Sequence, residues 1–382
     1  MSGRSVAASW GVLCTYALAH AAVDACCAVM LWSGYQDGRL TAGAAWSAFL
    51  FYNLLAFAMQ PLVGLAADRL RIGRGAAVTG ALLTAAALPL ALVPGVIAAA
   101  VVVAGLGNAV FHVGGGIVSL RAAPGRAAPV GVFVAPGAAG LAAGILAGKA
   151  GAPAWPFAAA LLALTVVLAV SRAPRFEVGR RAPFDRASGS DVRRPPLRTA
   201  PAAGGMVAVA LLLAVIGVRS YVGLALALPW KSDLWLLVAL TTGVVAGKAL
   251  GGLLGDHFGW RPVAVTALLF SLPLLALAGA SPTAGIVGLL VFNLTMPVTL
   301  AAVAAILPRG REGFAFGLTC LALFVGAAPS LTGWARPLSP AVLAALLLPA
   351  AAALWFALRG RRPRGALERT TATGTAAEGS FS

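Results

Sequence analysis

Long apolar runs recur along the whole of this 382-residue chain. A helix of about 20 apolar residues, roughly 30 Å long, is enough to cross the hydrocarbon core of a bilayer. The composition agrees, since 60% of the residues are hydrophobic and only 10% are charged, whereas about a quarter of the residues of a soluble domain are charged. The sequence therefore predicts an all-α polytopic membrane protein and excludes most soluble enzyme folds.

Charged, proline-rich or glycine-rich breaks divide the apolar runs into twelve predicted transmembrane helices, six on each side of a polar segment. That segment, residues 172–203, is too polar to cross a membrane and too rich in proline to pack as a core. We expect an N-terminal six-helix bundle over residues 1–171, a cytoplasmic linker over 172–203, a C-terminal six-helix bundle over 204–358 and a disordered cytoplasmic tail over 359–382. The spans are predicted over residues 9–34, 41–67, 76–94, 96–120, 130–150, 153–171, 204–230, 234–255, 262–281, 283–307, 313–335 and 338–358.

The basic residues fall on alternate sides of these spans. The chain has 28 Lys and Arg against 11 Asp and Glu, and 22 of the 28 lie in the termini, the linker and every second loop, against 4 in the remaining loops. Because cytoplasmic loops carry the excess of Lys and Arg, both termini and the linker are expected to be cytoplasmic. The net charge of +17 then reflects the orientation of the chain, whose basic loops lie next to anionic lipid on the cytoplasmic side. We therefore expect no nucleic-acid partner.

A short motif occurs twice, at the ends of the second and eighth predicted spans. Residues 64–69 read Gly-Leu-Ala-Ala-Asp-Arg, and residues 252–261 read Gly-Leu-Leu-Gly-Asp-His-Phe-Gly-Trp-Arg, so Asp68 and Asp256 lie 188 positions apart, close to half of the chain. An internal duplication of this kind is typical of secondary transporters, in which two repeats surround a site at the middle of the membrane.

An Asp at the end of a span can accept hydrogen bonds from the amides of a helix N-terminus, or from an Arg across the interface, and so hold the cytoplasmic face closed. The alternative is a plain turn whose charges anchor the helix ends among lipid headgroups. We expect the gating role, and its candidate residues are Gly64, Asp68, Arg69, Gly252, Asp256, Gly259 and Arg261.

The paired motif resembles the cytoplasmic loop signature of the major facilitator superfamily. This resemblance implies twelve helices in two six-helix bundles around a central cavity that the first, fourth and seventh spans line. The first copy of the motif departs from the family pattern, since Gly73 and Arg74 come two residues later than usual.

Ionisable residues inside the predicted spans are few, and such residues are functional by default because a charge at the bilayer centre costs about 2.5–3.5 kcal/mol on insertion scales. His20 and Asp24 are four residues apart in the first span and share a helix face, as do Asn108 and His112 in the fourth. The seventh span carries Arg219, followed by Ser220 and Tyr221, and the eighth carries Lys248.

Asp24 and Arg219 each lie about 15 residues from the cytoplasmic end of their spans, so they are expected at equal depth. Given the resemblance, one pocket can hold Asp24, His20, His112 and Arg219. Asp24 is the candidate carrier of a proton, and His20 its relay, since histidine titrates near neutral pH. The surplus of positive charge favours an anionic or zwitterionic solute on Arg219, and the other candidate substrate-binding residues are His112, Asn108, Lys248 and Tyr221.

Each of these interpretations has a structural alternative. Asp24 and Arg219 can form an ion pair that ties the two halves together. His112 can be a packed histidine bonded to a backbone carbonyl. Lys248, near the inner half of its span, can extend its charge toward the interface instead of the cavity.

Several segments resemble one branch of that superfamily, the fosmidomycin resistance proteins, which export drugs across bacterial inner membranes. The segments are Ala-His20-Ala-Ala-Val-Asp24, Gln60-Pro61-Leu-Val-Gly64, Gly105-Leu-Gly-Asn-Ala-Val-Phe111-His112 and Val218-Arg219-Ser220. The chain departs from the branch at Val113 and Gly114, where Pro and Glu are usual. It also has Ile145 where Pro would complete the antiporter glycine motif of Gly131, Gly140 and Gly144. Gly140, Gly144 and Gly148 equally suit close helix packing, whatever the direction of transport.

The residues predict a proton-coupled secondary transporter that works by alternating access, and the resemblance to the drug exporters implies that it exports a small anionic or amphiphilic compound. It is expected to be a monomer with many spans in the bacterial inner (plasma) membrane. The first alternative is an importer of an organic anion with protons, and the second is a membrane enzyme or assembly protein. No nucleophile elbow, phosphate loop or metal-ligand spacing is apparent in the sequence, so we expect no enzyme activity, no cofactor and no bound metal.

Overall fold

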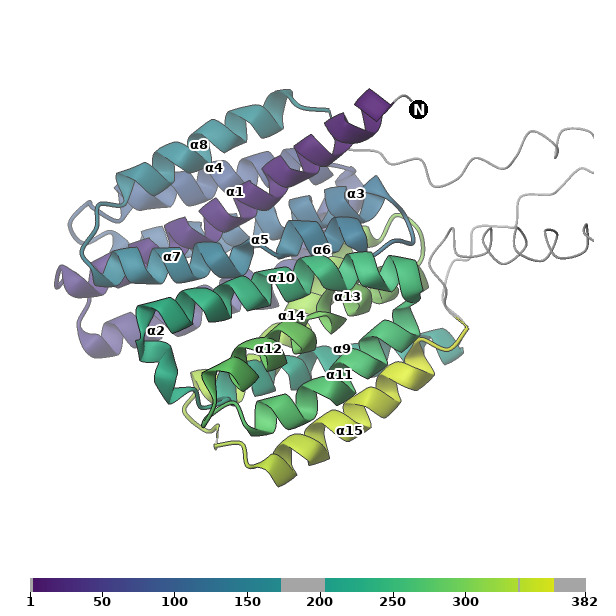
Figure 1. The fold of residues 1–382 in the computed structure, drawn as a ribbon. Coiled ribbons are helices and arrows are strands. Elements are labelled where there is room, and N and C mark those ends of the chain that lie inside the picture. Colours follow the sequence, from purple (N-terminus) through teal and green to yellow (C-terminus); the bar gives the residue numbers. More distant parts are fainter. Residues whose placement is uncertain (1–2, 173–202, 336, 361–382) are drawn as a thin grey trace, which may run out of the picture.

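The computed structural model describes residues 3–172, 203–335 and 337–360, and every regular element in these ranges is helical. The predicted linker and tail therefore lie almost wholly outside the described residues. Figure 1 shows the helices side by side along a common direction. Their bounds are α1 Gly3–Gln36, α2 Ala42–Asn53, η1 Leu54–Ala58, α3 Gln60–Leu70, α4 Gly73–Leu90, α5 Ile97–Ala122, α6 Ala128–Val134, α7 Gly137–Lys149, α8 Trp155–Val170, α9 Ala203–Ala225, η3 Pro229–Ser232, α10 Leu234–Phe258, α11 Trp260–Ala276, α12 Pro282–Asn293, α13 Thr295–Ile306, α14 Glu312–Leu331 and α15 Pro340–Ala357.

Each predicted span coincides with one helix or with one interrupted helix. The interrupted ones are α2 with η1 and α3, α6 with α7, and α12 with α13. A proline stands at or near the start of the last piece in each case, at Pro61, Pro136 and Pro297, and proline lacks the N–H that a continuous helix needs. Among the described residues, nine helices are long and apolar enough to cross a membrane, and Trp155–Val170 and Trp260–Ala276 are shorter apolar helices.

Some predicted spans extend past the end of their helix, the seventh and the ninth by five residues each. The seventh run continues to residue 230, but α9 ends at Ala225, and residues 229–232 form a separate 3₁₀ turn. Pro229 explains the break, because the residue before a proline is pushed out of the α region and Leu228 has φ −128° and ψ 80°.

The helices pack in two sets that follow the chain. In residues 3–172, α1 packs against α7 and α8, and α4 packs against α5; in residues 203–360, α9 packs against α14 and α15, while α12 packs against α10 and α11. The most extensive contacts between the two ranges join α3 to α14 and α6 to α10.

Small residues permit the closest of these packings. A Cβ atom on Gly140 would collide with the carbonyl of Ala21, and one on Gly144 with the carbonyl of Ala25. Glycines on one face of α7 therefore let its backbone touch that of α1, as the spacing of the glycines predicted.

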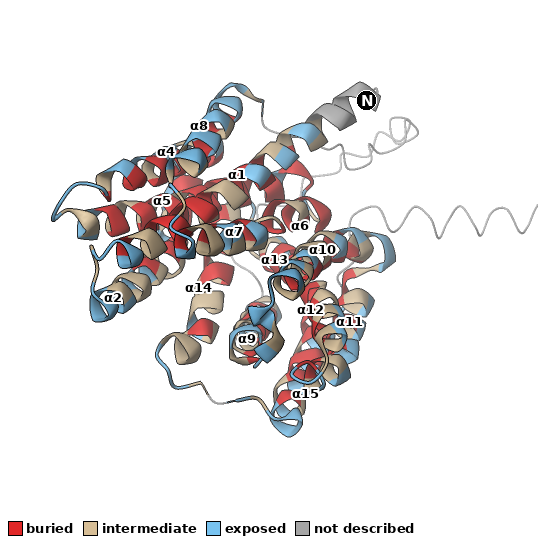
Figure 2. Cartoon of the chain, turned by 60° about the vertical axis from the view of Figure 1, so that its left-hand side comes forward, coloured by how far each residue is buried: buried red, intermediate tan, exposed pale blue. Residues whose placement is uncertain are grey.

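Figure 2 shows buried residues on the faces that the helices turn toward one another and exposed residues on the outer surface and at the helix ends. Large apolar side chains are among the exposed ones, including Val170, Trp235 and Phe270, which are 77%, 79% and 69% exposed. A water-facing surface rarely presents so much apolar area, so this outer surface suits hydrocarbon.

Candidate functional site

A cavity of about 1160 Å³ lies between the two sets of helices, lined by residues of α1, α2, α7, α9, α10, α12 and α14 among others. It reaches the surface at one end of the molecule, where Lys149 and Lys231 are exposed. Among the described residues that line it, Asp24 is the one acid, whereas the bases number four, namely Lys149, Arg219, Lys231 and Lys248. The cavity therefore carries a surplus of positive charge.

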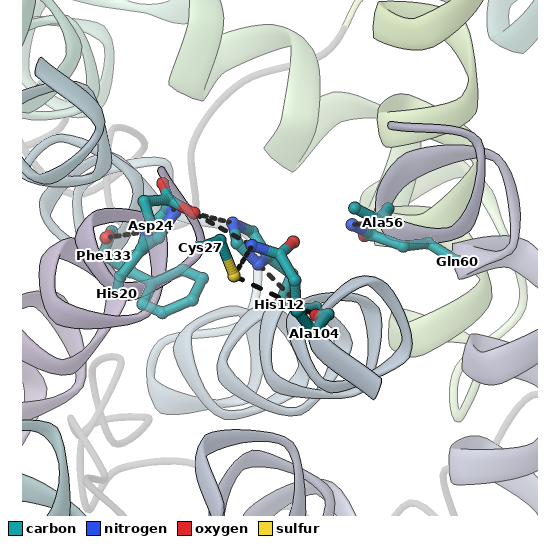
Figure 3. Close-up of polar contacts among 9 residues, drawn as sticks. His20, Asp24, Cys27, Ala56, Gln60, Ala104, His112 and Phe133 are labelled. Carbon is teal, nitrogen blue, oxygen red and sulfur yellow. Dashed lines mark hydrogen bonds and ion pairs between the residues drawn. The ribbon is translucent and has the colours of Figure 1, made fainter. Parts of the chain in front are cut away.

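Asp24 lies at the centre of a polar cluster contributed by α1 and α5 (Figure 3). Its Oδ2 lies 3.3 Å from Nε2 of His20, and its Oδ1 lies 3.7 Å from Nε2 of His112. The side-chain amide of Asn108 donates to the same Oδ1 at 3.1 Å. The side chain of Asp24 is 16% exposed, against 6% for each histidine, so the carboxylate lies between the cavity and the two imidazoles.

The opposite nitrogens of both imidazoles are held by backbone carbonyls. Nδ1 of His20 lies 2.9 Å from the carbonyl oxygen of Phe133, and Nδ1 of His112 lies 2.9 Å from that of Asn108. A carbonyl can only accept, so each Nδ1 must carry the proton, and a neutral imidazole has just one N–H. In the neutral form both Nε2 lone pairs would face the carboxylate oxygens, which is a repulsive arrangement. The cluster is therefore complementary to at least one additional proton.

The same three side chains form a group, among the described residues, whose donor atoms lie within 4.8 Å of one another and can surround a metal ion. Backbone carbonyls on the second imidazole nitrogen are also common in metal sites. The sequence suggested no metal ligands because these residues come from two separate spans.

Arg219 lies elsewhere in the cavity and does not pair with Asp24. Only 5% of the residue is exposed, and its guanidinium carbon lies 5.3 Å from the centroid of the Phe292 ring. Its Nε and Nη1 atoms are buried without a hydrogen-bond partner. The Asp24 carboxylate contacts His20, His112 and Asn108. The geometry therefore does not support the alternative of a structural Asp24–Arg219 ion pair.

The opposite end of the molecule is closed by two carboxylates. Asp68 on α3 accepts from the backbone amides of Gly313 and Phe314 at 2.9 Å each, at the start of α14. Asp256 on α10 accepts from the amides of Ala127 and Ala128 at 2.7 and 2.9 Å, at the start of α6. Each carboxylate thus neutralises the N-terminus of a helix from the other half of the chain.

An arginine also approaches each carboxylate. Nη2 of Arg121 lies 3.6 Å from Asp68 and donates to Glu312 at 2.8 Å, and Nε of Arg126 lies 3.9 Å from Asp256. The two clusters hold α3 against α14 and α6 against α10.

No family model matches this sequence, and no curated protein matches it either. Solved structures do match. The transporter FucP, in an outward conformation, has a TM-score of 0.65 at 14% identity, over 92% of this chain and 98% of its own. The E. coli fucose:proton symporter FucP gives 0.60 at 12% identity with the same coverages. A bacterial homologue of the iron transporter ferroportin, in an outward-facing state, gives 0.52 at 15% identity over 92% and 97%.

The chain has the major facilitator fold. These neighbours are described as a transporter, a symporter and a homologue of a transporter, and the likeness at 12–15% identity shows the fold. Two of the neighbours are described as outward; in this structure the cavity is open at one end and the helices are joined at the other. The fosmidomycin resistance branch stays a prediction from the sequence motifs.

Within this fold, the predicted substrate-binding residues divide into three groups. Arg219 and Lys248 line the cavity. His112 and Asn108 are buried and contact Asp24, so they are placed to position the carboxylate and not to meet a solute. Tyr221 lines a separate apolar groove between α9, α14 and α15, because two residues along a helix turn the side chain by about 200° from Arg219.

The predicted gating residues divide in a similar way. Asp68 and Asp256 make the contacts described above. Arg69 is exposed, Arg261 lies 4.3 Å from the ring centroid of Trp355 on α15, and Gly259 ends α10 with φ +102°. The arginines next to the carboxylates are Arg121 and Arg126, which the sequence interpretation missed. Their signal was position, since they flank the loop before the fifth span, on the same side as both motifs.

Proposed function

We propose that this chain is a proton-coupled secondary transporter that exports a small anionic or amphiphilic compound in exchange for protons. The observation that carries the proposal is the Asp24 cluster, in which one cavity-lining carboxylate faces two imidazole Nε2 atoms whose Nδ1 atoms are bonded to carbonyls. Such a group gains a proton from the cavity at little structural cost, because the acceptors are already in place.

Transport by alternating access follows from the two ends of the cavity. In the present conformation a proton reaches Asp24 from the open end, and His20 shares it at 3.3 Å. Opening the other end requires Asp68 and Asp256 to release the amides of α14 and α6. Bonds of this charge-assisted kind contribute about 1.5–3 kcal/mol each, so a few of them hold the end closed without making it irreversible.

The orientation in the membrane follows from the basic residues. The closed end carries Arg121, Arg126 and the two motifs, and by the positive-inside rule it faces the cytoplasm. The open cavity then faces outward, and both termini are cytoplasmic. We propose that the protein works as a monomer in the inner membrane of a bacterium.

The proposal is tested with the full chain in liposomes that contain a pH-sensitive dye. Phosphonates, organic acids and amphiphilic drugs are screened for substrate-dependent proton flux. Asp24→Asn should abolish that flux, since an amide cannot take up the proton. Asp233→Asn is the matched control, because Asp233 caps α10 at an exposed position and Asn caps a helix equally well. Unchanged flux in Asp24→Asn would falsify the assignment of the proton carrier.

Import of an organic anion together with protons is the second candidate, and the four basic residues that line the cavity favour it. A proton on Asp24 removes the one acidic charge there, which strengthens the binding of an anion. The two directions differ in cells, since export lowers the accumulation of a toxic substrate and import raises it.

A metal ion between His20, Asp24 and His112 is the remaining outcome. If zinc binds to the purified protein and its binding requires all three side chains, a metal ion would take the place of the proton in the proposed transport cycle. A membrane enzyme or assembly protein would instead form a product from a substrate in detergent, without any flux in liposomes.

A further inference from the structure

Two basic side chains at the inner part of the cavity lack an acidic partner. Arg219 is 95% buried, with Nε and Nη1 unpaired, and no ion pair is formed by Lys248 within the described ranges of the chain. A guanidinium offers five N–H donors, and a buried donor without an acceptor is costly. The arrangement is therefore complete only when an acceptor enters from outside the chain.

The surrounding charges specify a negatively charged acceptor. The Asp24 carboxylate is bound by His20, His112 and Asn108, and Lys248 interacts electrostatically with both Asp24 and Arg219. In an exchange with protons the solute binds after the proton has left the Asp24 cluster. With Asp24 ionised, Arg219 and Lys248 supply two positive charges against one negative charge, so a single negative charge on the solute balances the group. Lys149 and Lys231 at the mouth of the cavity raise the local concentration of anions.

Aromatic rings are among the other side chains that line the cavity. Phe49 on α2, Phe57 on η1 and Phe324 on α14 are all cavity-lining and only half-buried, so their faces are available to a bound molecule. Aromatic rings pack against one another with about 0.5–1.5 kcal/mol beyond the gain from burial alone. A solute with a flat apolar body and one acidic group would match both parts of the cavity.

We propose that Arg219 and Lys248 bind the carboxylate of an aromatic carboxylic acid whose ring packs against Phe57 and Phe324. This inference rests on the proposed transport function and extends it by naming the substrate class. A planar carboxylate matches the donors of Arg219. Its single negative charge balances the net positive charge of Arg219, Lys248 and Asp24, whereas a doubly charged phosphonate exceeds it.

The test measures binding of 3-phenylpropionate to the full chain in lipid nanodiscs by calorimetry, with no pH gradient. We expect saturable binding. The neutral 3-phenylpropionamide and the cationic 3-phenylpropylamine should bind at least tenfold more weakly, and 3-cyclohexylpropionate severalfold more weakly. Equal affinity for the amide would overturn the anion site. Tighter binding of phenylphosphonate at pH 8, where it is doubly charged, would overturn the choice of a carboxylate.

Variants assign the site to its residues. Arg219→Gln and, separately, Lys248→Gln should each lower the affinity for 3-phenylpropionate by about tenfold or more. Arg219→Lys should recover part of that affinity. Arg74→Gln is the matched control, because Arg74 is an exposed arginine bonded to the Ser171 carbonyl, away from the cavity. Phe324→Leu should lower the affinity for 3-phenylpropionate more than the affinity for 3-cyclohexylpropionate. Unchanged affinity in both Gln variants would contradict the proposal.

The two proposals fail in different ways. If 3-phenylpropionate does not bind, while another substrate drives proton flux that depends on Asp24, the substrate class is wrong and the transport function stands. If 3-phenylpropionate binds through Arg219, but no substrate moves protons in liposomes, the binding site stands and the coupling to protons is wrong.

Discussion

Asp68 and Asp256 make the same contact in opposite directions between the two halves of the chain. Asp68, in the first half, caps α14 in the second, and Asp256, in the second half, caps α6 in the first. The repeated motif of the sequence thus becomes a pair of equivalent clasps at one end of the cavity. Both must open together if the two halves are to rock about a central site.

Removing the charge of one clasp should open that end. In Asp68→Asn the amide nitrogen would face the backbone N–H groups of α14, so at least one bond is lost and the closed state should weaken by roughly 2 kcal/mol. Spin labels at Leu70→Cys and Arg309→Cys, with the exposed Cys14 replaced by Ser, would report a longer distance between α3 and α14. Asp37→Asn, an exposed carboxylate at the opposite end paired with Arg39, should leave the distance distribution unchanged. A distribution identical to wild type in Asp68→Asn would rule out the clasp.

The Arg121–Glu312 pair should matter much less. Its atoms lie 2.8 Å apart, but the two side chains are 39% and 21% exposed, and exposed ion pairs contribute about 0.2–1 kcal/mol. We expect Glu312→Gln to shift the same label distances less than Asp68→Asn does, and to retain most of the transport. An effect as large as that of Asp68→Asn would show that Glu312 is part of the clasp itself.

Backbone contact at the clasp requires glycine at position 64. A Cβ atom on Gly64 would collide with the carbonyl of Gly313, so Gly64→Ala should force α3 and α14 apart. Overpacking of this kind typically costs about 1–3 kcal/mol, which should appear as a lower melting temperature in detergent together with reduced transport. Gly43→Ala is the control, since nothing lies within 4 Å of its added methyl group. Wild-type stability and transport in Gly64→Ala would disprove the close contact.

The pH profile of transport should depend on His20. Without its Nε2 atom the Asp24 cluster loses a base that helps to hold the proton, so His20→Gln should move half-maximal substrate-dependent flux to a more acidic external pH. His257→Gln, at the end of α10 and away from the cluster, should keep the wild-type profile. The measurement is flux against external pH at constant substrate, and an unshifted profile in His20→Gln would exclude the relay role.

The sequence by itself determined the helical spans and the few polar residues within them. Apolar runs of sufficient length are fixed by the thickness of the bilayer, which is why their number and order agree with the helices. The spacing of His20 and Asp24 also placed both on one face of α1, because that relation is local to a single helix.

Relations between helices were decided only by the tertiary structure. The arginines beside the two carboxylates are Arg121 and Arg126, not Arg69 and Arg261 of the motif. Helix packing determines which of several nearby cations reaches a carboxylate. Arg219 and Tyr221 point to opposite sides of α9, and the packing of α9 against its neighbours decides that Arg219 faces the cavity and Tyr221 does not. The pairing of Asp24 with two histidines and not with Arg219 likewise depends on distances between spans, which no local pattern of residues encodes.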